Sequence, residues 1–104
     1  SCQEVIMDYE KDIDWDMIAR RIPPAKDTRI FSGPLSQLDY HFEKAFVASS
    51  NRSLAGDVQS LLTDQLRRHF EDRCKTIHFM AGQYGLSFEE AFIRLATGES
   101  LNNE

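Results

Sequence analysis

Cysteine is scarce in this chain, and its two cysteines are poorly placed for a cross-linked framework. Cys2 lies beside the first residue, whereas Cys74 falls on the apolar stripe of an expected helix. Small secreted domains that depend on disulfides carry more cysteines at regular spacings. We therefore expect no disulfide, and we interpret Cys74 as a small core residue.

Long apolar runs are also missing. No segment is apolar over the roughly 20 residues that a membrane-spanning helix needs, and we find no signal-peptide pattern and no lipidation motif. These absences predict a cytoplasmic protein that does not enter a membrane.

Motifs that carry catalysis are absent as well. The sequence has no nucleophile elbow and no glycine-rich phosphate loop. His41, His69 and His78 could each act as a base, but no nucleophile motif accompanies them. Glu89 and Glu90 are adjacent, so on a helix they point to different sides and make a poor acid–base pair. We expect a non-enzymatic protein with no catalytic residues and no cofactor.

Metal-ligand patterns are incomplete. Three alternating aspartates match the opening of a calcium-binding EF-hand loop: Asp12, Asp14 and Asp16. Met17 and Pro23 stand where that loop needs glycine and glutamate. Cys74 and His78 lie one helical turn apart, but they supply only two of the three or four ligands that a tight site needs. We expect no metal site.

The charge balance is acidic. The formal net charge is −5 and the pI is about 5.1. Much of the excess lies in residues 1–16, where six acidic residues accompany Lys11 alone. A general nucleic-acid binder would instead show a basic stripe, so the composition disfavours that class of protein.

The chain does have a strong helical periodicity. Apolar residues in residues 53–84 recur in eight steps over 30 residues, about 3.75 residues per step, which is typical of one face of an α-helix. The stripe comprises Leu54, Val58, Leu62, Leu66, Phe70, Cys74, Ile77, Ala81 and Tyr84. We expect residues 53–84 to form the central helical stretch, with Leu66, Phe70 and Ile77 in the core.

The length of this stretch leaves two possibilities open. An unbroken helix of 32 residues would be roughly 48 Å long, longer than the roughly 33 Å diameter of a compact domain of this size. Either the helix breaks, for which Arg73–Cys74 is a reasonable place, or a second chain covers the overhang. We favour the homodimer.

Capping residues, prolines and glycines predict three further helices. One begins at Asp12 or Asp14 and stops before Pro23, and the segment 23–33 follows as a linker. A second runs from Pro34 or Ser36 to about Ala48. Gly85 closes the central stretch, and a last helix opens with the capping-box pattern of residues 87–90 and ends at Gly98.

These elements predict an all-α fold. We expect a small helical bundle of about four helices around one long central helix, which dimerisation could complete. Residues 1–104 would form a single helical domain with frayed ends at 1–3 and 99–104.

Phe79 does not fit the apolar stripe. On a helix it lies about 160° from both Ala81 and Ile77, each two residues away. We expect Phe79, with Met80 beside it, to enter a second interface, because aromatic and methionine side chains are enriched in protein contacts. The predicted partner or dimer interface is Phe79, Met80, Tyr84, Phe88 and Phe92.

The leading interpretation is a small non-enzymatic regulatory or adaptor protein that binds another protein and acts as a homodimer. The sequence does not identify the partner. The alternative is a DNA-binding transcriptional regulator that uses a helical corner at residues 84–87. Its contacts to nucleic acid would be Arg67, Arg68, Arg73, Lys75 and Arg94. Acidic residues interleaved with these cations disfavour the alternative.

Overall fold

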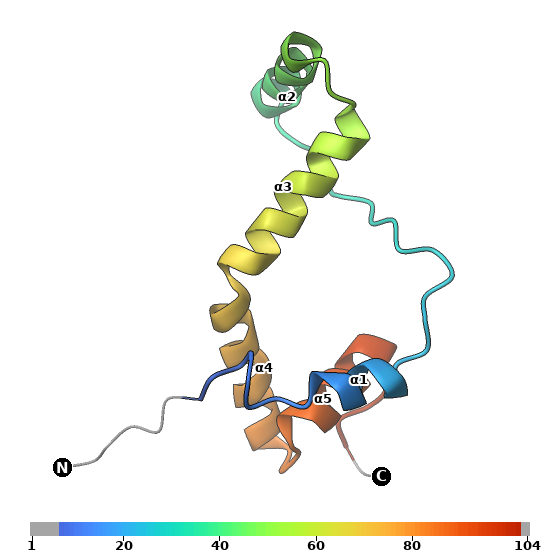
Figure 1. The fold of residues 1–104 in the computed structure, drawn as a ribbon, viewed down its shortest axis with the longest axis vertical. Coiled ribbons are helices and arrows are strands. Elements are labelled where there is room, and N and C mark those ends of the chain that lie inside the picture. The colour runs from blue at the N-terminus through green and yellow to red at the C-terminus, as the bar shows by residue number, and fades with distance from the viewer. Residues whose placement is uncertain (1–6, 103–104) are drawn as a thin grey trace, which may run out of the picture. The chain divides into compact units, whose positions relative to one another are not determined.

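The computed structural model describes residues 7–102, and every regular element within them is an α-helix (Figure 1). The five helices are α1 (Trp15–Arg21), α2 (Gln37–Ser50), α3 (Leu54–Arg68), α4 (Phe70–Gln83) and α5 (Phe88–Thr97). The predicted all-α class is confirmed. No helix among the described residues is long and apolar enough to span a membrane.

The contacts within the chain divide it into two compact units. The first joins the residues up to Ala25 to those from Phe70 onwards, and the second comprises Lys26–His69. This is a finer division than the single domain expected from sequence. Of the expected frayed segments 1–3 and 99–104, residues 1–3 and 103–104 lie outside the described residues. Within residues 99–102, the Leu101 carbonyl accepts a hydrogen bond from Arg94.

The central stretch is two helices and not one. α3 ends at Arg68, and His69 has φ −104° and ψ 19°, outside the helical region. α4 begins at the next residue. The break therefore lies five residues before Cys74, ahead of the place suggested by the apolar spacing, and it coincides with the boundary between the two units.

The start of α3 explains a glycine inside a helix. Ser53 caps α3, and its hydroxyl accepts a hydrogen bond of 3.0 Å from the Gly56 N–H. A Cβ on Gly56 would lie 2.7 Å from that hydroxyl. Gly56 thus makes room for the cap, and the helix begins at Leu54.

The first unit is built around an apolar core. α1 is capped by Asp14, whose carboxylate accepts from the Met17 N–H at 3.0 Å. α1 and α4 both pack against α5. The buried side chains of this core are Tyr9, Ile13, Ile18, Cys74, Phe88 and Ile93. Phe70 and Ile77 are half-buried against it.

Trp15 joins the parts of this core. Its ring centroid lies 5.3 Å from that of Phe92, 5.8 Å from Phe88 and 5.9 Å from Phe70. Its indole N–H donates a 2.7 Å hydrogen bond to the Tyr9 carbonyl. Edge-to-face and tilted aromatic pairs at these distances stabilise a core beyond the burial of their area.

Polar groups also tie α1 to α5. The Asp14 N–H donates to a carboxylate oxygen of Glu89 at 3.2 Å. The Glu90 carboxylate forms salt bridges with Arg21 at 2.6 Å and with Arg94 at 3.0 Å. Hydrogen bonds from Arg21 and then Arg94 lower the pKa of the Glu90 carboxyl below its ordinary value of 4.5. The first-turn acids of α5 are thus half-buried structural groups.

The corner between α4 and α5 has Gly85 and Ser87 in the capping positions that the sequence predicted. Gly85 has a φ of 64°, which favours glycine, and the Leu86 N–H bonds back to the Ala81 carbonyl at 2.9 Å. The Ser87 hydroxyl then accepts from the Glu90 N–H at 3.1 Å. Gly98 ends α5 in the same left-handed conformation.

The second unit is organised differently. α2 and α3 contact each other, and Val47 and Asp57 are the buried residues of these helices. Arg52 pairs with Asp57 at 3.1 Å, and a hydrogen bond with Asp57, together with burial, raises the pKa of Glu43. The internal contact of this unit therefore includes the polar group of Glu43, Arg52 and Asp57 beside the apolar Val47.

The apolar side chains of the second unit are exposed. The large residues on one side of α2 are all exposed, namely Leu38, Phe42 and Phe46. On α3, Leu66 is 45% exposed, so the expectation that Leu66 belongs to the core is wrong. The other α3 members of the apolar stripe, Leu54, Val58 and Leu62, are exposed as well.

Replacing Phe88 by alanine tests the core of the first unit. Phe88 is 4% exposed, so Phe88→Ala should lower the free energy of unfolding by about 3–5 kcal/mol, through lost burial and the cavity left behind. Trp15, the single tryptophan, reports this unfolding in a denaturant melt followed by fluorescence. Phe31→Ala is the control, because Phe31 is 98% exposed. A loss below about 1 kcal/mol in Phe88→Ala would contradict this core.

The Glu90 carboxylate should make the stability of the fold depend on pH. Its pKa is lowered in the folded chain, so its ionised form stabilises the fold. This contribution is complete above about pH 4.5 and is lost as the pH falls through the lower folded-state value. Glu90→Gln should therefore be less stable than the wild type at neutral pH and lose less stability on acidification. Glu71→Gln, in an exposed pair with Lys75, is the control in melts at neutral pH and near pH 3. An unchanged acid loss in Glu90→Gln would refute the role of Glu90.

Candidate functional site

The outer side of α4 presents large apolar side chains. Phe79 is 69% exposed, and Met80 and Tyr84 are exposed as well. The same helix buries Cys74 and Ala81 against the core. Phe79 is exposed because it lies off the stripe that these buried residues define, as the sequence indicated.

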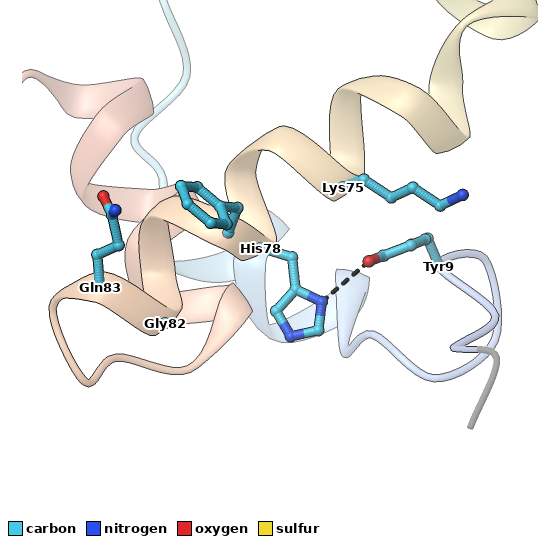
Figure 2. Close-up of a pocket in the computed structure, with 6 residues that line it drawn as sticks. Tyr9, Lys75, His78, Gly82 and Gln83 are labelled. Atoms are coloured by element: carbon cyan, nitrogen blue, oxygen red, sulfur yellow. Dashed lines mark hydrogen bonds between the residues drawn. The ribbon is translucent and has the colours of Figure 1, made fainter. Parts of the chain in front are cut away.

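A hollow of about 490 Å³ lies beside Phe79. Tyr9 from the N-terminal segment forms part of its lining, and the other residues come from α4 (Figure 2). They are Lys75, His78, Phe79, Gly82 and Gln83. Residues three and four apart lie on one side of a helix, so the local sequence of α4 gathers these side chains along one strip.

Tyr9 and His78 point toward each other in the hollow (Figure 2). The Tyr9 hydroxyl and His78 Nδ1 are 2.9 Å apart, and the rings meet edge-to-face at 5.8 Å. This bond occupies Nδ1 of the half-buried histidine. The pair holds the N-terminal segment on α4 and gives one wall of the hollow a polar edge.

Gly82 lines the hollow without adding a side chain to it. A Cβ built at this position would meet nothing within 4 Å, so the glycine relieves no clash inside the chain. It exposes helix backbone beside Phe79, where another molecule could approach closely. Lys75 adds one cation at the edge, in a 3.7 Å pair with Glu71, and such exposed pairs are weak.

The polar side chains of the hollow belong to Tyr9, Lys75, His78 and Gln83. The residues lining the hollow include no carboxylate, serine or cysteine. Cys74 is buried, and burial raises the pKa of its thiol, which disfavours the reactive thiolate. Residues 7–102 contain no group of three or more histidine, cysteine, aspartate or glutamate side chains arranged to hold a metal ion.

Two residues of the predicted interface belong instead to the core. Phe88 is buried, and Phe92 is half-buried and packs against the same core, 5.3 Å from the Trp15 ring. α5 is amphipathic and turns these side chains toward α1 and α4. The surface part of the predicted interface is therefore Phe79, Met80 and Tyr84.

The basic residues of the alternative interpretation are mostly occupied. Arg94 bonds to Glu90 and to the Leu101 carbonyl. Arg68 pairs with Asp64, and Lys75 with Glu71, both across one helical turn. Arg67 and Arg73 lie on different helices, α3 and α4. These ion pairs weaken the case for a basic surface that meets phosphate.

Sequence reasoning missed Tyr9, Gly82 and the link between Tyr9 and His78. Tyr9 and His78 are 69 residues apart, and neither residue belongs to a local motif from which the pair could be predicted. Gly82 lies within a helical pattern, and its place in the lining of the hollow is visible only in the structure.

Comparisons with known proteins give no further assignment. No protein-family model, no curated protein and no solved structure matches this chain. The geometry of the hollow is therefore the basis for interpreting the site.

Removing the Tyr9 hydroxyl tests the wall of the hollow. Tyr9→Phe keeps the buried ring but deletes the bond to His78, which should cost about 1 kcal/mol of unfolding free energy. Tyr84→Phe is the matched control, because Tyr84 is exposed on the same unit. Denaturant melts followed by Trp15 fluorescence measure both variants. Equal stability of Tyr9→Phe and the wild type would mean that the bond contributes nothing.

Proposed function

We propose that this chain is a non-enzymatic regulatory or adaptor protein, that it binds another protein through the surface around Phe79, and that it acts as a homodimer. The observation that carries the proposal is the exposure of Phe79, 69%, at the rim of a hollow on a helix whose buried residues are Cys74 and Ala81. Phe79, Met80 and Tyr84 supply the apolar contact, and the hollow receives a side chain of the partner.

Energetics support a contact at this place. Covering an exposed phenylalanine contributes roughly 2 kcal/mol. α4 is held by the core through Cys74 and Ala81, so the surface is already in shape and little ordering is needed on binding. Large aromatic side chains beside a pocket are the usual centre of binding energy in protein interfaces.

The shape and polarity of the hollow indicate the partner segment. Phe79 and the open backbone at Gly82 fit an apolar anchor, and the Tyr9–His78 pair offers hydrogen bonding at its edge. A short amphipathic segment with one large apolar side chain and a neighbouring polar group meets both requirements.

Phe79→Asp tests the proposal, because a carboxylate cannot be buried in an apolar contact without a large cost. A pull-down from the native host, followed by calorimetry with the retained partner, should show at least tenfold weaker binding, which corresponds to about 1.4 kcal/mol. Phe31→Asp is the control, because it makes the same substitution at another exposed phenylalanine. Equal binding by the wild type and Phe79→Asp, with helical circular dichroism retained, would refute this surface.

A further inference from the structure

A second hollow adjoins the one beside Phe79. It has a volume of about 270 Å³, and it shares Tyr9 with the first hollow, so the two meet at that side chain. Its other lining residues are Met7, Asp8, Glu10, Phe70 and Glu71. Glu71 lies one turn before Lys75 on α4, and their charged groups are 3.7 Å apart. The two hollows therefore follow one side of α4 within the first unit.

The second hollow combines carboxylates with apolar contacts. Its acidic residues, Asp8, Glu10 and Glu71, are all exposed. Met7 and Phe70 are half-buried and supply the apolar part of the lining. A lysine or arginine side chain has the same two parts, because an apolar stem carries its charged head. The lining therefore suits a long basic side chain better than a metal cation, which is coordinated by oxygen ligands alone.

Most carboxylates of the second hollow have no cationic partner among the described residues. Within residues 7–102, neither Asp8 nor Glu10 forms a salt bridge, and Glu71 has only the exposed pair with Lys75. Oδ1 of Asp8 accepts the N–H groups of Glu10 and Lys11, at 3.0 and 3.2 Å. These bonds hold the turn that presents the carboxylates on the surface.

The net charge of the surface is negative. Of the described residues that line the two hollows, three are acidic and Lys75 is basic, which gives −2 with His78 counted as neutral. The charged residues that follow along the two segments cancel in pairs, Lys11 with Asp12 and Asp72 with Arg73. An approaching basic segment is therefore attracted, and an acidic one is repelled.

One short segment reaches both hollows. Glu71 and His78 are seven residues apart on α4, which corresponds to roughly 10 Å along the helix axis. About three residues of extended chain span the same distance. A basic and a large apolar side chain at that separation can occupy the two hollows together.

We propose that the partner segment is basic: its large apolar side chain packs on Phe79 in the first hollow, and a lysine or arginine about three residues away enters the second hollow. Opposite charges across a contact speed association and select the partner. This inference rests on the proposed function and names the chemistry of the partner at the same surface.

A random library of dodecapeptides displayed on phage tests the partner chemistry. Peptides retained by the wild type are counter-selected against Phe79→Ala, which leaves the net charge unchanged, so that binders that depend on Phe79 remain. These peptides should be enriched in lysine or arginine near a large apolar residue, relative to the unselected library. Enrichment of acidic residues, or no charge preference, overturns the basic partner and leaves the surface around Phe79 in place. Absence of any peptide that depends on Phe79 refutes the proposed function and this inference with it.

Calorimetry with the most enriched peptide tests the carboxylates. The variant with Glu10→Gln and Glu71→Gln should bind it about fivefold more weakly or worse, because two ion pairs are lost. The control carries Asp72→Asn and Glu99→Gln, which change the net charge equally at exposed residues that line neither hollow, and it should bind like the wild type. Unchanged binding by the first variant, or an equal loss in both, overturns the proposal.

Lys75→Gln should act in the opposite direction. It removes the cation of the lining and releases Glu71 from its 3.7 Å pair, so the basic peptide should bind about two- to fivefold more tightly. An acidic partner would instead lose the cation that attracts it. Equal or weaker binding by Lys75→Gln overturns the proposal.

Discussion

The packing of Trp15 is the contact on which the first unit depends. Its ring joins α1 to Phe88 and Phe92 of α5, and its indole N–H fixes the Tyr9 carbonyl at 2.7 Å. Tyr9 in turn reaches His78 and lines the hollow beside Phe79. The candidate binding surface is thus supported by a continuous set of contacts that begins in the core, which gives it the rigidity that favours binding.

The second unit has no comparable centre. Its internal contact includes the buried Asp57 and its partner Arg52, and burying a charge recovers little net stability even when it is paired. The apolar side chains that would stabilise α2 and α3 are exposed. A contact that covered these side chains would supply this unit with the apolar burial that its own fold lacks.

Much of the helical arrangement could be predicted from sequence, because local punctuation decides it. Ser36, Ser53 and Ser87 cap three helices, and Gly85 and Gly98 follow two. The sequence suggested a helix break at Arg73–Cys74, whereas the structure has it at His69. The apolar spacing continues unchanged through His69 and so does not reveal the break. The Tyr9–His78 pair could not be predicted, because the two residues are 69 apart in the chain. They meet only when tertiary contacts, such as the Trp15 hydrogen bond to the Tyr9 carbonyl, hold the N-terminal segment against α4.

The contrast between Leu66 and Cys74 shows what periodicity can establish. Both residues belong to one apolar stripe, yet Cys74 is buried and Leu66 is exposed. A repeating pattern tells which side of a helix is apolar, but the partner that covers that side comes from elsewhere in the chain or from another molecule. In α4 the partners are α5 and the N-terminal segment around Tyr9. In α3 the side chains of the stripe remain exposed.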